Sequence, residues 1–577
     1  MRNKIHILAL LLLVAGFLPA QDKHVKLKIL QTSDIHGNYF PFNFIENKFW
    51  EGSLSRVYTF AQKNREVFND NLILLDNGDV LQGQPTAYYY NFIDTISFHL
   101  AAEIMNFMGY NAGSMGNHDI ETGHVVYDRW VKQCDFPILG ANIIRTSDGG
   151  LYLKPYEIIE REGVKIAILG MITPAIPAWL PEVLWEGLHF EDMEVTAEKW
   201  MKIIKEEERA DVVIGLFHSG KNSNMVSGKY NENASMDIAR NVPGFDVIMF
   251  GHDHLRECSK IVNSKGDSVL IINPANNGNV VADVDLDLVL KEGKVMDRAI
   301  GGRLTDLTDF EPSEAFMIKF APNFEDVKDF VSKKIGYLTD SISIRPAYFG
   351  PSPFIDLIHR LQLDLTGADI SFTAPLSFDA HISKGDVRVA DMFSLYKYEN
   401  MLYTMSLSGQ EIKDYLEMSY ALWTNQMKTS GDHLLLFKEN AGSGERAIFV
   451  NYSFNFDSAA GIIYTVDVTK PQGEKISIVG MADGRPFELV RMYKVALNSY
   501  RGNGGGELLT KGAGIPSEML QSRIIKSTDK DLRYYLIKYI EDKKTVSPYS
   551  LNQWKFIPEE WTIPASVRDH KLLFGNK

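Results

Sequence analysis

Short apolar runs separated by polar loops and helical stretches fill the first half of the chain. Residues 25–30 alternate between apolar and polar side chains, as in a strand with one buried face. Five further runs are nearly continuous in Val, Ile and Leu, which is typical of strands in a covered sheet, and they span residues 71–75, 164–169, 212–217, 247–250 and 269–272. Helical spacing over residues 93–108 and 193–209 lies between these runs. The pattern predicts an α/β domain over residues 24–305.

The pattern changes after about residue 300. Apolar residues at helical spacing predict an amphipathic helix within a linker over residues 306–339, and they are Phe324, Val327, Val331, Ile335 and Leu338. Two domains are also the expectation for a chain of 577 residues, which is too long for one compact core.

A second α/β domain is predicted over residues 340–550, followed by a tail over 551–577. Residues 353–365 are expected to be helical, and residues 370–373 and 401–407 to be strands. Ser408 and Glu411 match a capping box, in which each side chain satisfies a free amide at the start of a helix. That helix is predicted to run through Tyr420.

The N-terminal twenty residues have the pattern of a secretory signal peptide. Arg2 and Lys4 precede a short apolar run over residues 7–17, and Leu18-Pro19-Ala20 precede a polar stretch. The run is too short to span a bilayer, although an uncleaved N-terminal anchor is the alternative. We therefore expect a secreted protein, periplasmic or at the cell surface, with no stable membrane span after cleavage of the signal.

The net charge and the number of cysteines limit the partners, the disulfides and the metal ligands that this chain can have. The formal net charge of −14 disfavours binding to polymeric nucleic acid, because an acidic surface repels the phosphate backbone. Only Cys134 and Cys258 occur, so a disulfide framework is not expected, and a single bridge between them is left open. A metal site in this chain must therefore use His, Asp and Asn. We expect a monomer.

Residues typical of metal ligands follow five of the predicted strands. Each group stands directly after an apolar run, and the groups are Asp34 with His36, Asp79, Asn117 with His118 and Asp119, His218, and His252 with His254. Any one of these alone is more simply a capping or surface residue. Five strand ends that carry such residues converge on one edge of an α/β sheet, where loops bind ligands.

Together these side chains predict a site for two divalent metal ions. Two cations about 3.5–4 Å apart repel each other and need a bridging carboxylate, for which Asp79 is the natural candidate. Imidazole and carboxylate ligands suit Zn, Mn or Fe, and the absence of thiolates from the set argues against a structural zinc cage.

These five groups resemble the signature blocks of calcineurin-like metallophosphoesterases. The wider chain resembles the secreted 5′-nucleotidase and 2′,3′-cyclic-nucleotide phosphodiesterase family, in which a linking helix joins that domain to a C-terminal nucleotide-binding domain. The resemblance implies a four-layer αββα sandwich followed by a smaller α/β domain. It also implies one metal held by Asp34, His36, Asp79 and His254, and another held by Asp79, Asn117, His218 and His252.

The same resemblance gives His118 a role off the metals. It would stabilise charge on the phosphoryl group or protonate the leaving oxygen. A carboxylate should orient its ring. By the family's spacing this carboxylate is Glu121, and Asp119 is the competing candidate.

Two blocks in the second domain resemble the family's nucleobase site. They are residues 396–400 and 498–506, and position-by-position matching implies that the base lies between Tyr398 and Tyr500. Asn400 and the glycines Gly504 and Gly505 are further candidate contacts. The alternative is that both tyrosines pack in the core.

The chain departs from the 5′-nucleotidase branch of the family. Residues 374–379 read Ala-Pro-Leu-Ser-Phe-Asp where many 5′-nucleotidases have Gly-Gly-Gly-x-Arg, so an expected substrate arginine is missing. This segment and residues 455–457 favour the cyclic-nucleotide branch. We therefore expect hydrolysis of small nucleotide phosphoesters, releasing nucleoside and phosphate. The alternatives are a hydrolase of another anionic ester, such as a UDP-sugar or a sulfur ester, and a non-catalytic surface protein that binds nucleotides.

Overall fold

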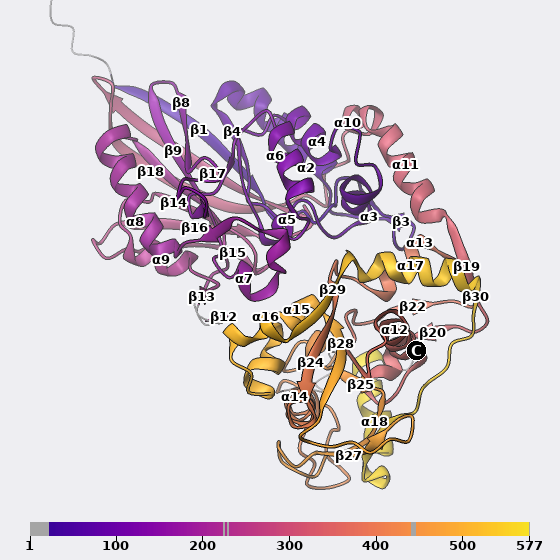
Figure 1. The fold of residues 1–577 in the computed structure, drawn as a ribbon. Helices are drawn as coiled ribbons and strands as arrows, with labels where there is room; N and C mark the ends of the chain where they lie inside the picture. Colours follow the sequence, from indigo (N-terminus) through magenta and orange to yellow (C-terminus); the bar gives the residue numbers. More distant parts are fainter. Residues whose placement is uncertain (1–21, 223–225, 228–229, 440–445, 576–577) are drawn as a thin grey trace, which may run out of the picture.

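The fold is taken from a computed structural model that describes residues 22–222, 226–227, 230–439 and 446–575. The predicted signal peptide lies outside these residues. Figure 1 shows a first domain coloured indigo to magenta and a second coloured orange to yellow, with helix α11 beside both. Among the described residues, no helix combines the length and apolarity needed to cross a bilayer.

Two six-stranded sheets form the centre of the first domain. One has the order β18-β17-β1-β4-β5-β6, with bounds Lys294–Asp306, Val280–Lys291, Lys23–Thr32, Leu72–Asp76, Ala112–Ser114 and Ile138–Leu139. The other has the order β15-β16-β14-β11-β9-β8, with bounds Arg256–Val262, Ser268–Pro274, Val247–Phe250, Val212–His218, Val164–Ile172 and Tyr156–Arg161. All six predicted strands of the first half are therefore present.

The central strands of both sheets run parallel. In the first sheet β1, β4, β5 and β6 pair in parallel, and in the second β9, β11, β14 and β16 do so. Parallel strands end at the same edge of a sheet, so the loops that follow them gather at that edge. This geometry is what brings the predicted ligands together.

Four layers make up the first domain, as the sequence predicted. The inward faces of both sheets supply one apolar cluster, which includes Ile29, Ile73, Ile168 and Ile214. The outer face of the first sheet packs against α2 (Leu54–Phe68), α4 (Leu100–Met108) and α6 (His124–Gln133). The outer face of the second packs against α8 (Met193–Ile203) and α9 (Ser235–Asn241). The αββα fold class is confirmed.

Two predicted helices are shorter than expected. The helix predicted from residue 93 begins only at Leu100, where the His99 ring accepts the Ala101 amide and caps the first turn. The linker is broken into α10 (Glu314–Lys319) and α11 (Ala321–Ser332).

The predicted linker helix is wrong beyond residue 332. Residues 334–338 form strand β19 (Lys334–Leu338), which pairs with β23 (Gly385–Arg388) and β30 (Thr545–Val546). The strands that pair with β19 on both sides favour the extended conformation over the helix that the spacing of Ile335 and Leu338 predicted. Both side chains are buried in the strand as well.

A mixed five-stranded sheet forms the centre of the second domain. Its order is β25-β21-β28-β24-β29, with bounds Ser458–Ala460, Ile370–Thr373, Met492–Asn498, Met401–Ser408 and Ile524–Asp531. The helices α12 (Pro353–Thr366), α14 (Gly409–Trp423) and α17 (Leu532–Lys543) pack with it. The capping box is present, since Ser408 Oγ accepts the Glu411 amide and the Glu411 carboxylate accepts the Ser408 amide.

The C-terminal segment is not the tail that the sequence predicted. Strand β31 (Trp554–Ile557) pairs in parallel with β26 (Ile462–Asp467), and α18 (Glu559–Phe574) follows it. Trp554, Phe556 and Leu573 are buried in the core of the second domain. Residues 551–575 therefore belong to that domain, because their apolar side chains are part of its core.

Neither cysteine is in a disulfide. Cys134, which follows α6, and Cys258, on the edge strand β15, both carry free thiols. The bridge that the sequence left open is absent from this structure, and the fold is held by its apolar clusters.

Candidate dinuclear metal centre

The predicted ligands lie where the parallel strands end. Asp34 and His36 follow β1, Asp79 follows β4, and Asn117 begins the short helix α5 (Asn117–Ile120) after β5. His218 is the last residue of β11, and His252 and His254 follow β14. Each side chain is thus fixed by a strand buried in the sandwich.

Five of these seven residues have a left-handed backbone. Their φ angles lie between 48° and 75°, and the residues are Asp34, His36, Asp79, His252 and His254. A positive φ is unfavourable for a residue with a side chain, and such strain is found at functional sites that the surrounding fold over-determines. The loops are therefore shaped to turn these side chains inward.

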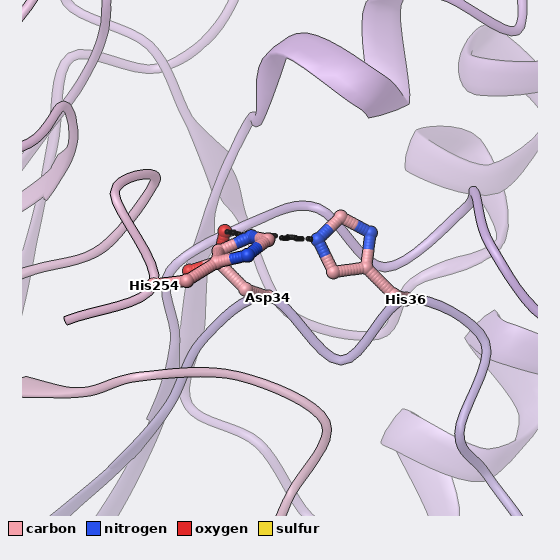
Figure 2. A group of neighbouring side chains, drawn as sticks. All are labelled: Asp34, His36 and His254. Atoms are coloured by element: carbon pink, nitrogen blue, oxygen red, sulfur yellow. Dashed lines mark hydrogen bonds and ion pairs between the residues drawn. The ribbon is translucent and has the colours of Figure 1, made fainter. Parts of the chain in front are cut away.

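Asp34, His36 and His254 form the first group. Their ligand atoms lie within 4.8 Å of one another, and Figure 2 shows the two rings and the carboxylate facing a common point. The Nε2 atoms of His36 and His254 are 3.0 Å apart, and His254 Nε2 lies 3.3 Å from Asp34 Oδ1. That Asp34 oxygen is buried and has no hydrogen-bond partner among the described residues, as expected of an oxygen that ligates a cation.

Asp79, His218 and His252 form the second group, with Asn117 between the two rings. The ligand atoms of the three titratable residues again lie within 4.8 Å of one another. Asn117 Oδ1 lies 3.0 Å from His218 Nε2 and 2.8 Å from His252 Nδ1. Asp79 Oδ2 is 3.2 Å from His218 Nε2.

Asp79 stands between the two groups. The same Oδ2 atom that faces His218 lies 4.0 Å from His36 Nε2 in the first group. A single carboxylate that faces both clusters is the geometry a pair of cations requires. The donor set of imidazoles, carboxylates and one amide fits two divalent ions such as Zn²⁺ or Mn²⁺.

Neighbouring charges shift the pKa values of the buried titratable groups in this pocket. Burial raises the pKa of Asp34, but its contact with His254 and the charges of His218 and His254 outweigh burial and bring the pKa to about 2. Burial lowers the pKa of His118, but the charges of Asp79 and Glu121 outweigh it and raise the pKa to about 9. Asp34 is therefore ionised, whereas burial, with the charges of His254 and His118, lowers the pKa of His36 to about 4 and leaves that ring neutral, as a metal ligand must be.

His118 lies beside the two groups and pairs with Glu121. Its Nδ1 donates to Glu121 Oε2 at 2.5 Å, and its ring centroid lies 5.5 Å from that of His36. Asp119 points elsewhere: its two oxygens accept the amides of Asp79, Val80, Leu81 and Gly116, each at 2.9 Å. Glu121 thus orients the imidazole, and Asp119 fixes the loop that carries Asp79.

The predicted base-binding tyrosines lie in the second domain near this pocket. Tyr398 and Tyr500 are both half-buried. Burial, and then the charges of Tyr500 and Glu121, raise the pKa of Tyr398 to about 12. Asn400 is buried, and its amide donates to the Tyr396 hydroxyl at 3.5 Å.

The glycine-rich turn fits closely around Tyr500. A Cβ at Gly505 would lie 2.5 Å from the Tyr500 ring, and Gly504 has a φ of 104° that favours glycine. Arg501, which is 2% exposed, pairs with Asp457 at 3.1 Å and donates to the Gly505 carbonyl at 2.6 Å. The buried arginine holds the turn that carries Tyr500.

Two residues around His252, Trp179 and Glu232, were not identified from the sequence. Trp179, at the end of α7 (Ile176–Trp179), stacks on His252 with ring centroids 5.7 Å apart, and its carbonyl accepts from Asn503 Nδ2 at 3.1 Å. Glu232 Oε1 lies 3.1 Å from His252 Nε2. Neither Trp179 nor Glu232 directly follows an apolar strand, so the pattern that revealed the predicted ligands gives no signal for them.

Comparison with known proteins agrees with this geometry. Residues 27–256 match the calcineurin-like phosphoesterase family, and residues 334–511 match the 5′-nucleotidase C-terminal domain. The chain is 26% identical over 618 residues to a 2′,3′-cyclic-nucleotide 2′-phosphodiesterase/3′-nucleotidase of Yersinia enterocolitica, covering 95% of this chain and 91% of the relative. It is 29% identical over 600 residues to a trifunctional nucleotide phosphoesterase of Bacillus subtilis, covering 93% of this chain but only 39% of that longer protein.

The fold is also shared with solved structures. A Staphylococcus aureus protein crystallised with alpha-ketoglutarate has a TM-score of 0.77 at 21% identity, covering 92% of this chain and 100% of that one. The two domain matches follow each other in the order that the structure shows. The chain belongs to the two-domain phosphoesterases in which a calcineurin-like phosphoesterase domain precedes a 5′-nucleotidase C-terminal domain.

Proposed function

We propose that the chain is a secreted, metal-dependent hydrolase of nucleotide phosphoesters, with 2′,3′-cyclic and 3′-nucleotides as its preferred substrates. The observation that carries the proposal is Asp79, whose carboxylate faces His36 of one ligand group and His218 of the other. The relative from Yersinia enterocolitica, which shares both domains, is named for activity on these nucleotides and supports the preference.

Two cations would be held by the two groups described above. Asp34, His36, Asp79 and His254 would hold one, and Asp79, Asn117, His218 and His252 the other. When bound, the cations activate water and neutralise charge on the phosphoryl group.

The remaining residues position the substrate. His118, held through Nδ1 by Glu121, presents Nε2 to a phosphoryl oxygen or to the leaving oxygen, as a general acid would. Tyr398 and Tyr500 would hold the base between their rings, as aromatic side chains do in proteins that bind single-stranded nucleic acids. Hydrolysis would release phosphate and nucleoside outside the cytoplasm.

A phosphate-release assay on a substrate panel tests this proposal. We expect turnover of 2′,3′-cyclic AMP and 3′-AMP above that of 5′-AMP or UDP-glucose, and its loss after treatment with a chelator. Asp79→Asn should lower kcat by about 1,000-fold or more, because removing a bridging charge costs several kcal/mol of transition-state stabilisation. The exposed Asp148→Asn is the matched control and should leave kcat unchanged.

Each alternative has its own result in the same assay. Preferred turnover of UDP-glucose would indicate a hydrolase of other anionic esters. Nucleotide binding with no release of phosphate from any substrate would indicate a non-catalytic protein. Wild-type turnover by Asp79→Asn would rule out the assigned centre.

A further inference from the structure

The imidazole ring of His252 has a polar partner at each nitrogen and an aromatic ring stacked on one face. Its Nδ1 faces Asn117 Oδ1 at 2.8 Å, on the side where the second ligand group converges. Its Nε2 faces Glu232 Oε1 at 3.1 Å, and Trp179 stacks on the ring. The inward nitrogen of this ring is therefore Nδ1, and the outward one is Nε2.

The other three histidines have the opposite orientation. Each directs Nε2 inward, and the outward Nδ1 atoms face neutral groups: the Gln82 carbonyl for His36 at 3.3 Å, the Asn77 carbonyl for His218 at 2.6 Å, and the Asn276 amide for His254 at 3.1 Å. Of the four ligand histidines, His252 is the one whose outward nitrogen faces a carboxylate among the described residues.

We propose that Glu232 is a positioning residue that fixes the tautomer of His252 and tightens cation binding at the group formed by Asp79, Asn117, His218 and His252. The carboxylate accepts a hydrogen bond from Nε2–H, so the proton stays on Nε2 and the lone pair of Nδ1 would be free to bind the cation. This inference rests on the proposed dinuclear centre.

The environment of the pair makes this contact strong. The side chains of Glu232 and His252 are each about one-tenth exposed, so the contact is poorly screened by water. A carboxylate behind a metal-bound imidazole raises the basicity of the ligating nitrogen, and removing such partners typically costs about 10- to 100-fold in metal affinity. A neutral carbonyl in the same place would orient the ring without adding this charge effect.

The backbone of Glu232 has a separate role, which allows the side chain to be tested alone. Its carbonyl accepts the Ser219 hydroxyl at 2.8 Å, and Ser219 in turn accepts the Ala234 amide. These bonds hold the loop and do not depend on the identity of the side chain at position 232.

Stepwise titration of the apoprotein with Zn²⁺ tests the proposal. The apoprotein is prepared with a chelator and titrated calorimetrically in the presence of a competing ligand. We expect two equivalents in the wild type. In Glu232→Gln, which keeps the length and an acceptor oxygen but loses the charge, one Kd should rise about 10- to 100-fold and the other stay the same. Glu232→Ala should have the larger effect.

Two further variants show which of the two Zn²⁺ equivalents binds at which ligand group. Glu257→Gln removes a nearby carboxylate that pairs with Lys221 and should change neither Kd. His254→Ala removes a ligand of the other group and should abolish the other of the two equivalents. At saturating Zn²⁺, Glu232→Gln should recover wild-type kcat, whereas Asp79→Asn should not.

The outcomes separate this inference from the proposed function. Two wild-type equivalents with both Kd values unchanged in Glu232→Gln would overturn the role of Glu232 alone, as would equal weakening of both. Failure of the wild type to bind two equivalents would overturn the dinuclear centre itself. Equal unfolding temperatures of the apoproteins would show that Glu232→Gln is folded, and that variant decides the test if Glu232→Ala is unstable.

Discussion

Asp119 and Glu121 divide two tasks that the sequence could not assign. Asp119 is fully buried, and its oxygens accept four backbone amides, including that of Asp79. Glu121 contacts His118 directly. One carboxylate therefore holds the loop, and the other holds the ring that would meet the substrate.

Substitution of these two residues should give different defects. Glu121→Gln should lower kcat by about 10- to 1,000-fold with little change in unfolding temperature, because His118 loses the charge that fixes its proton on Nδ1. Asp119→Asn should instead lower the unfolding temperature, because its amide group would face backbone donors. Steady-state kinetics and thermal unfolding measure both. Unchanged kcat in Glu121→Gln would contradict the assignment.

At the scale of single residues, the sequence predicted those side chains that immediately follow a buried strand. All seven proposed ligands are of this kind, and the fold brings them into two adjoining groups. Glu232 lies in a loop and Trp179 at the end of the short helix α7, and the path of both segments depends on tertiary packing. No local pattern marks them, so only the structure could place them beside His252.

Among the elements, strands were predicted more accurately than helix ends. Buried runs of Val, Ile and Leu are unambiguous when the sheet is covered on both faces. Ile335 and Leu338 were assigned to a helix because both are apolar and fall at helical spacing, although they lie in a strand. The prediction failed there because the pairing partners of β19 lie 47 to 208 residues away in the sequence.

One helix contains a carboxylate that makes the second domain sensitive to pH. Asp356 on α12 is 4% exposed and accepts the Leu551 amide at 2.8 Å. Burial raises its pKa from 3.8 to about 6, so the folded state favours the neutral acid. Its stability contribution is fully present below pH 3.8 and is lost as the pH rises through about 6.

Asp356→Asn should therefore stabilise the protein at high pH. The amide keeps an acceptor oxygen for Leu551 but has no charge to bury. We expect an unfolding temperature higher than that of the wild type by a few degrees at pH 8, with little difference at pH 4. Asp364→Asn, at an exposed position of the same helix, is the control and should change neither value. A pH-independent effect of Asp356→Asn would exclude titration as the cause.

The whole molecule brings its second domain against the metal pocket. Asn503 donates to the Trp179 carbonyl, and Tyr88 of the first domain donates to Asp531 of the second at 3.3 Å. The Arg533 guanidinium lies 4.9 Å from the Tyr88 ring centroid. These contacts, at Trp179 and at Tyr88, hold the second domain, which carries Tyr398 and Tyr500, against the first.

Because the proposed base site lies in the second domain and the metal pocket in the first, a substitution at the base site should slow hydrolysis only of substrates that have a nucleobase. Tyr500→Ala should lower kcat/KM for 2′,3′-cyclic AMP by about 10- to 100-fold, because one base stack is worth about 1–3 kcal/mol. Turnover of bis(p-nitrophenyl) phosphate, which has no nucleobase, should change far less. Tyr535→Ala is the control, since this tyrosine pairs with the exposed Asp529. Equal losses on both substrates would reject the stacking role.

The two unpaired cysteines allow this protein to be labelled chemically. Cys258 is exposed on an edge strand of the first domain, whereas Cys134 is half-buried, and burial raises the pKa of both thiols but that of Cys134 more strongly. Because the thiolate is the reactive form, a maleimide dye should attach at Cys258 first. A native chain could therefore be labelled at a single point on its metal-bearing domain, without engineering and without breaking any cross-link that the fold needs.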